Sequence, residues 1–183
     1  ERMGSSDCGS LDMMVYYVMG LAQPFQALTE EFKLSKKTGE QSGDIFNAVA
    51  SYCVICLLSY ITGEPLTYVR RKSIDCIVQM KEQNMMAFLG IQSLFHSQLA
   101  ALIDGPQIAD AESVDDVIFG EKKALAAAGK DNFEALSSYE AHQLVRAFLY
   151  RKFDILSSSS FFETISDPTI PNEPFRVMTF FSA

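Results

Sequence analysis

The sequence contains no tryptophan and only two histidines, His96 and His142, which lie far apart in the chain. Neither has a metal-ligand or nucleophile partner at a suitable spacing, and Cys53 and Cys56 have no second cysteine pair to complete a zinc site. The chain also lacks the motifs G-x-x-x-x-G-K-[ST], G-x-G-x-x-G after a strand, H-R-D, D-F-G and G-x-S-x-G. We therefore expect no catalytic residue, no cofactor and no metal ion, and we interpret both histidines as surface or half-buried residues.

The sequence also has fewer basic than acidic residues. Lys and Arg number 15 against 23 Asp and Glu, which gives a net charge of −8. The basic cluster at residues 70 to 72 is flanked within a few residues by Glu64 and Asp75. Because nucleic acid and anionic membrane surfaces require basic patches, we expect neither as a partner.

The cysteines do not have the regular spacing of a disulfide framework. All four, Cys8, Cys53, Cys56 and Cys76, lie in apolar or helical contexts, and no signal-peptide pattern precedes them. These features favour a reducing, cytoplasmic location.

The composition is that of a globular protein, with 48% apolar and 21% charged residues in a chain of 183. Residues 1 to 10 combine Gly and Ser with little apolar content, which predicts a linker or frayed end. We expect a single helical-repeat domain over 11–183. The start at Glu1 without Met and the apolar end PFRVMTFFSA indicate a piece of a longer protein.

Apolar runs at helical spacing alternate with short turns, which predicts an all-α fold of about eight helices. Asp44 is expected to cap one helix, Gly39 and Gly43 to close the helix before it, and Gly63 and Pro65 to separate the two that follow. A long loop is expected at 104–135, with a short helix in EKKALAAAGK closed by Gly129. The expected helices are 12–22, 24–37, 44–62, 65–83, 85–103, 136–152 and 154–166, followed by a last, truncated one.

Short connections between such helices favour antiparallel helix pairs, and a series of pairs favours an α-solenoid. The pair from Asp44 to Gln83 spans about 40 residues, longer than the 34 of a strict tetratricopeptide repeat. The W-LG-Y and A-F-P signature of that repeat is absent as well. Any repeat in this chain is therefore expected to be structural and degenerate.

The run Ile45 to Thr62 has 18 uncharged residues, which is the lower limit for a spanning helix. Its polar residues, with Asp44, fall within one third of the helix circumference, and a helix exposed to lipid has no reason to keep such a stripe. Cys53 lies mid-helix, away from the helix N-terminus at which a redox-active cysteine is placed. We interpret the run as an inner helix with one side near solvent, and Cys53 and Cys56 as core packing.

An acidic segment precedes the short helix and invites comparison with a calcium loop. It lacks the Gly and the terminal Glu of such a loop, so we expect a solvated loop. The segment comprises Asp110, Glu112, Asp115 and Asp116.

The order of the residues that begin and end the expected helices resembles a recurrent segment of very large signalling proteins. The likeness covers Met14 to Phe153 and rests on MVYYVMGLAQPFQAL, a GD-led helix, GEPL, QMKEQN, LIDG and YEAHQLVRAFLYRKFD. Those proteins join a serine/threonine kinase-like domain, an AAA or NACHT-type ATPase, a helical region, and often a GAF domain with a histidine kinase. The Ser-rich helix after Asp154 departs from the pattern, and the region past Pro168 matches weakly.

The resemblance implies a tetratricopeptide-like (TPR-like) right-handed superhelix that acts as a spacer or sensor. It implies partners that are protein segments or neighbouring domains of the same chain. The inner helices 44–62 and 85–103 would line the contact surface, and the candidate interaction residues are Asn47, Ser51, Gln92 and His96.

Two alternatives remain open. One is a small helical ligand-binding bundle or enzyme with an interhelical pocket; polar or charged pairs in the core would favour it. Its expected lining is Tyr52, Tyr60, Phe88 and Phe95. The other is a membrane-associated segment built on Ile45 to Thr62.

Overall fold

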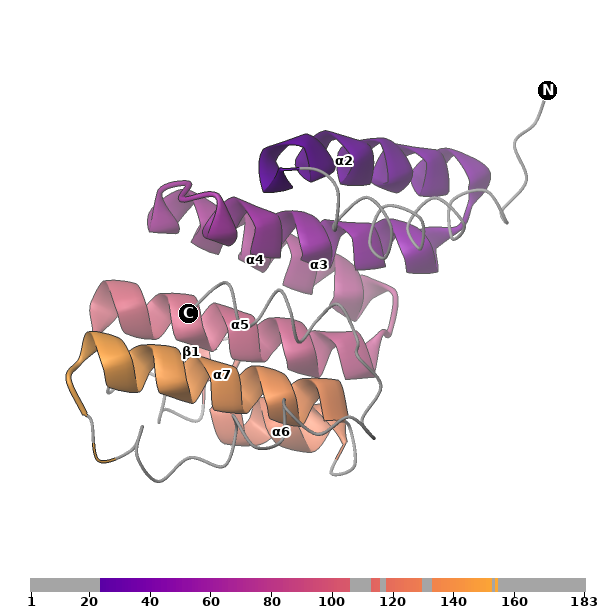
Figure 1. The fold of residues 1–183 in the computed structure, drawn as a ribbon. Coiled ribbons are helices and arrows are strands. Elements are labelled where there is room, and N and C mark those ends of the chain that lie inside the picture. Colours follow the sequence, from indigo (N-terminus) through magenta and orange to yellow (C-terminus); the bar gives the residue numbers. More distant parts are fainter. Residues whose placement is uncertain (1–23, 106–112, 116–117, 130–132, 153, 155–183) are drawn as a thin grey trace, which may run out of the picture. The chain divides into compact units, whose positions relative to one another are not determined.

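A computed structural model describes residues 24–105, 113–115, 118–129, 133–152 and 154. These residues form an all-α fold, in which six helices are accompanied by one small antiparallel ladder (Figure 1). The expected helices at 12–22 and beyond 154 lie outside the described residues, as do Cys8 and the N-terminal linker. The chain groups into two compact units, Glu1–Met85 and Met86–Ala183.

In the first unit, α2 (Phe25–Ser42) is longer than the sequence predicts. It does not end near Lys37. Gly39 lies buried within the helix, and Lys36 and Glu40, one turn apart, form an ion pair across this stretch. Gly43, at φ 82°, ends the helix, because that left-handed conformation suits glycine best. Gly39 therefore serves helix packing, and Gly43 alone terminates α2.

The next helix, α3 (Ile45–Ile61), begins and ends where the sequence predicts. The side chain of Asp44 accepts a hydrogen bond from the Asn47 backbone N–H at 3.3 Å, which confirms the expected cap. Gly63 lies at φ 79° just past the other end. Only two residues join α2 to α3, so the two helices run antiparallel and pack along each other.

The third helix of this unit, α4 (Leu66–Glu82), follows Pro65 and packs against α3. The spacing of Leu66, Val69, Ser73, Cys76 and Met80 predicts one buried stripe, and the structure adds Ile77 to it and leaves Leu66 half-buried. The buried residues are Val69, Ser73, Cys76, Ile77 and Met80. They join Leu28 and Phe32 of α2 and Ile55 and Leu58 of α3 among the core side chains of this unit.

The second unit begins with α5 (Met86–Asp104), which contacts both α6 (Glu121–Ala128) and α7 (Phe133–Leu149). Leu94 of α5, Ala124 of α6 and Ala135 of α7 form a small apolar core. The hydroxyl of Tyr150 donates a 2.6 Å hydrogen bond to the Ala101 carbonyl, which ties the end of α7 to α5. The three helices therefore pack around a shared centre.

The segment between α5 and α7 carries more regular structure than the expected long loop. Strands β1 (Ser113–Asp115) and β2 (Ile118–Phe119) pair antiparallel, with an irregularity between Ser113 and Asp115. The short helix in EKKALAAAGK is present as α6 and ends at Gly129, as predicted. Helix α7 begins three residues before the expected start at 136. Strands this short carry too little periodicity to be seen in a sequence.

Candidate functional site

A buried ion pair joins α6 to α7 in the second unit. Arg146 Nη1 lies 2.5 Å from Glu121 Oε1, with side chains only 8% and 7% exposed. Arg146 Nη1 has no hydrogen-bond partner among the described residues, so this contact is an ion pair without hydrogen-bond geometry. Glu121 lies in the first turn of α6 and Arg146 in the last turn of α7, where the helix dipoles favour each charge.

Gln143 completes the surroundings of the Glu121 carboxylate. It lies three residues before Arg146 on α7, on the same side of the helix, and its Nε2 donates to Glu121 Oε2 at 3.1 Å. Both carboxylate oxygens therefore have a partner on α7. A buried carboxylate needs such compensation, because removing it from water without partners is very unfavourable.

His142 lies one turn before Arg146 on the same helix. Its Nδ1 is buried and has no hydrogen-bond partner in the part of the chain that the structure describes. Burial and then the charge of Arg146 lower the pKa of His142 from 6.5 to about 3. The ring of Phe95 on α5 is 6.2 Å away, centroid to centroid. His142 is therefore neutral at pH 7.

Helix α5 contributes a run of buried polar residues. Ser93, Ser97 and Gln98 are at most 1% exposed, and their side-chain polar atoms find no hydrogen-bond partner among the described residues. Each buried polar group left without a partner costs about 1–3 kcal/mol. We call Glu121, Gln143 and Arg146 with these three α5 residues the buried polar set of the second unit.

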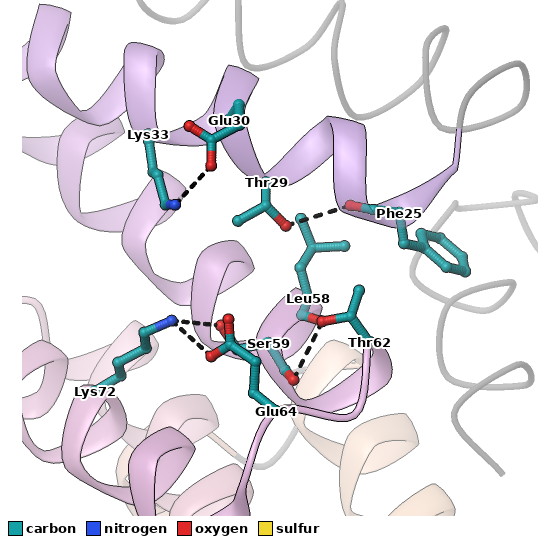
Figure 2. A network of polar contacts seen from close by, with 9 residues as sticks. All are labelled: Phe25, Thr29, Glu30, Lys33, Leu58, Ser59, Thr62, Glu64 and Lys72. Carbon is teal, nitrogen blue, oxygen red and sulfur yellow. Dashed lines mark hydrogen bonds and ion pairs between the residues drawn. The ribbon is translucent and has the colours of Figure 1, made fainter.

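The first unit has a polar network at the junction of α3 and α4, which Figure 2 shows from close by. Lys72 Nζ donates to Ser59 Oγ at 2.8 Å and to Glu64 Oε2 at 2.9 Å. The bond from Lys72 holds the pKa of Glu64 below its usual 4.5. Lys72 also lies 4.5 Å from the centroid of the Tyr68 ring. One ammonium group thus ties the α3–α4 connection to both helices.

The expected solvent-facing side of α3 is not where the sequence predicts. Ser51 and Ser59 of the polar stripe are each 1% exposed, whereas Asp44, Asn47 and Thr62 at its ends are half-buried. Ser51 Oγ donates to the Asn47 carbonyl at 2.8 Å and lies 3.1 Å from Ser35 Oγ of α2, and Ser59 accepts from Lys72 of α4. Because hydrogen bonds to these partners replace hydrogen bonds to water, the hydroxyls of Ser51 and Ser59 can be buried between packed helices.

The four candidate interaction residues lie in two different units. Asn47 is half-buried, and its Nδ2 donates to Asp44 Oδ2 at 2.8 Å, so it serves the start of α3. Ser51 is buried against α2. Gln92 and His96 of α5 are 4% and 0% exposed. The role of these four residues in binding stays a prediction, and a partner could reach the side chains of Ser51, Gln92 and His96 only after rearrangement.

The expected pocket-lining aromatics are also split between the units. Tyr52 and Tyr60 are half-buried in the first unit, and Phe88 and Phe95 belong to α5 of the second. Tyr52 lies beside α2, with Lys36 Nζ 5.0 Å from its ring centroid. Burial raises the pKa of Tyr52 far above 10, so its hydroxyl is neutral.

In the described ranges, no group of three or more His, Cys, Asp or Glu is arranged to hold a metal ion. No described helix, α3 included, is long and apolar enough to cross a membrane. Of the acidic segment, Asp115 lies in β1, and the other three residues lie outside the described ranges.

Comparison with known proteins does not place the chain in a family. No family model, no curated protein and no solved structure matches it.

Sequence reasoning did not single out Glu121 or Arg146. Each reads as an ordinary charge on an amphipathic helix, and 24 residues separate them. The available signal was weak: Glu121 follows Gly120 at a helix start, and Arg146 stands near a helix end among apolar neighbours. Which charges become buried depends on how α6 and α7 pack, and spacing alone does not reveal it.

Proposed function

We propose that this chain is a non-catalytic, TPR-like helical scaffold that mediates contacts between proteins or between domains of one signalling protein. Under this proposal the parent protein is a cytoplasmic multidomain ATPase or kinase, and the segment relays conformational change between its domains. The observation that carries the proposal is the arrangement of the first unit. There, α2, α3 and α4 follow one another through connections of two and four residues, and each packs chiefly on its neighbour in sequence.

Packing between sequence neighbours is the property that defines a solenoid. It leaves faces of each helix for binding, and the first unit has apolar side chains at its surface. Leu34 of α2, Phe46 of α3 and Tyr68 and Val78 of α4 are 40 to 56% exposed. Under the proposal, some of these side chains contact a protein partner, because aromatic and aliphatic anchors dominate such interfaces.

Site-specific photo-crosslinking tests the scaffold function. A photoreactive residue would replace Phe46 or Tyr68 in the protein expressed in its own host, with Lys33 and Glu82 as exposed polar control positions. We expect crosslinks from the apolar positions to a segment of the same polypeptide, or to a protein that carries an ATPase or kinase domain. Equal labelling at all four positions, or none, would contradict the proposal.

The buried polar set favours a second candidate for the second unit, a small ligand-binding bundle. Polar and charged pairs inside a core are the feature that would distinguish this alternative, and Glu121, Gln143 and Arg146 supply them. Gln98 supplies a buried amide with donors and an acceptor still available.

Replacement of Gln98 separates the two functions. If no ligand binds, Gln98→Met removes a buried amide without partners and should raise the free energy of unfolding by about 1 kcal/mol. If the amide binds a ligand, the protein purified from its host should release a small molecule on denaturation, and Gln98→Met should abolish that release. Mass spectrometry of the released material distinguishes these outcomes.

A further inference from the structure

Three of the four cysteines meet between α3 and α4 of the first unit. Cys53 Sγ lies 3.8 Å from Cys76 Sγ, and Cys56, one helical turn after Cys53, also lies beside Cys76. All three are free thiols. The two helices form an antiparallel pair, and Cys53 and Cys76 each lie roughly two to three turns from the connection. The chain reversal thus brings residues 23 positions apart to the same level.

The three thiols differ in access. Cys53 is half-buried, and its Sγ lies 3.3 Å from the Val49 carbonyl. Cys56 and Cys76 are 0% exposed. An oxidant from solvent therefore reaches Cys53 first, and Cys76 is positioned behind it.

We propose that Cys53 and Cys76 are a reversible oxidation site, in which a hydroperoxide converts the two thiols into one disulfide across α3 and α4. The Cys53 thiolate attacks the distal oxygen of the peroxide and breaks the O–O bond, which forms a sulfenic acid at Cys53. The leaving oxygen takes up the proton that the Cys53 thiol lost and departs as water or an alcohol. The Cys76 sulfur then attacks the Cys53 sulfur. The S–O bond breaks, the hydroxyl leaves with the Cys76 proton as water, and the two thiols have together supplied two electrons.

The surroundings of the buried thiols fit these roles. The hydrogen bond with Cys53 and burial raise the pKa of Cys76, and the hydrogen bond with Cys76 and burial raise the pKa of Cys56. Because the thiolate is the reactive form, neither buried thiol reacts readily with peroxide by itself. Cys76 becomes competent only when an electrophilic sulfur stands beside it.

The site differs from the C-x-x-C motif that the sequence displays. Cys53 and Cys56 lie three positions apart on one helix, whereas Cys53 and Cys76 approach across two helices. A disulfide requires the sulfurs to close from 3.8 Å to about 2.05 Å, within reach of side-chain rotation and a small helix shift. The bond would close a loop between the two helices and lock the hairpin, so oxidation would alter how easily α4 moves relative to α3.

The test uses the full 183-residue chain with Cys8→Ser, because Cys8 lies outside the described residues. The reduced, folded protein is exposed to hydrogen peroxide, quenched with an alkylating agent and mapped by mass spectrometry without reduction. We expect a linked peptide pair that contains Cys53 and Cys76, with the loss of two hydrogens, and its disappearance with dithiothreitol. The midpoint of urea unfolding should rise on oxidation and return on reduction.

Three variants make the assignment specific. Cys53→Ser should abolish the linkage, and Cys56→Ser, the matched control, should retain it. Cys76→Ala should leave a sulfenic acid at Cys53, which a dimedone reagent labels even if this variant is less stable. Far-ultraviolet circular dichroism checks that each variant folds.

Three results would overturn the proposal. They are a Cys53–Cys56 linkage in the protein with all three cysteines, a Cys56–Cys76 disulfide that forms equally fast in Cys53→Ser, and thiol loss that occurs only in urea. Each would mean that the approach of Cys53 to Cys76 in the folded chain does not direct the oxidation. None of these measurements depends on the scaffold function, so either proposal can fail without the other.

Discussion

Arg146 of α7 and Glu121 of α6 form an ion pair, 2.5 Å from Nη1 to Oε1, that is almost completely shielded from water. A pair of this kind is weak evidence for stability, because the loss of hydration offsets much of the attraction between the charges. Its geometry is nevertheless well supported, since Gln143 also donates to the carboxylate. The pair therefore makes the packing of α6 on α7 specific.

Removal of one partner should be strongly destabilising. We expect Glu121→Gln or Arg146→Met to lower the free energy of unfolding by about 3–5 kcal/mol, because each leaves a buried charge without its counterpart. Urea unfolding of the full chain provides the measurement. The exposed pair Glu30–Lys33, with side chains 74% and 52% exposed, is the matched control. Glu30→Gln should change stability by less than about 1 kcal/mol.

The double variant Glu121→Leu with Arg146→Met should be less destabilised than the sum of the single variants. With both charges gone, no unpaired charge remains in the core, and the replacement can approach neutrality. Additive losses would instead mean that the two residues act independently, despite their contact.

His142 should make stability depend on pH in the acidic range. Its pKa is about 3 in the folded chain and near 6.5 when unfolded. Between these values the unfolded chain binds a proton that the folded chain does not. Stability should therefore fall as pH decreases from about 6.5 toward 3, by at most about 1.4 kcal/mol per pH unit from this group.

The variant His142→Gln isolates this contribution. The difference in unfolding free energy between the parent and His142→Gln, measured from pH 7 to pH 4, should shrink or reverse as pH falls. A pH-independent difference would show that His142 has the same pKa in the folded and unfolded states, contrary to the lowered pKa expected from its burial.

Asp44 should stabilise the folded chain, although its side chain is only half-buried. Its carboxylate accepts from the Asn47 backbone N–H and from Asn47 Nδ2, at 3.3 and 2.8 Å. We expect Asp44→Ala to reduce the free energy of unfolding by about 1 kcal/mol, and Asp44→Ser to restore most of it, because Ser is also a good N-cap. Thermal unfolding followed by circular dichroism measures both. An equal loss in the two variants would mean that the carboxylate charge, and not capping, is responsible.

Lys72 should stabilise the α3–α4 junction, whereas Lys33 should contribute little to the free energy of unfolding. Lys72→Met removes bonds to Ser59 and Glu64 and should cost about 1–2 kcal/mol. Lys33→Met, at an exposed pair on α2, should stay within about 0.5 kcal/mol. In Lys72→Met the pKa of Glu64 should also rise toward 4.5, because Lys72 is the main cause of its depression. NMR titration of the Glu64 carboxyl group measures this shift, and an unchanged pKa would assign the effect to other neighbours.

The sequence by itself determined α3, α4 and their ends, but it placed the end of α2 near Lys37, five residues too early. Asp44 begins α3, Gly43 and Gly63 end α2 and α3, and Pro65 precedes α4, because caps, left-handed glycines and prolines act within a few residues. The prediction that Gly39 closes α2 is wrong, because Gly39 lies buried inside the helix. Local sequence does not distinguish a glycine packed within a helix from a glycine that ends one.

Only the tertiary structure decided which polar side chains are buried together. Across pairs of helices, Ser51 contacts Ser35, Arg146 contacts Glu121 and Cys53 contacts Cys76. The two residues of each pair lie 16 to 25 positions apart in the sequence. Helical periodicity assigns a residue to a side of its own helix, but it does not say which neighbouring helix covers that side or which side chain lies opposite. Those meetings depend on the packing of one helix against another, and for this reason the ion pair and the thiol pair became visible only in the folded chain.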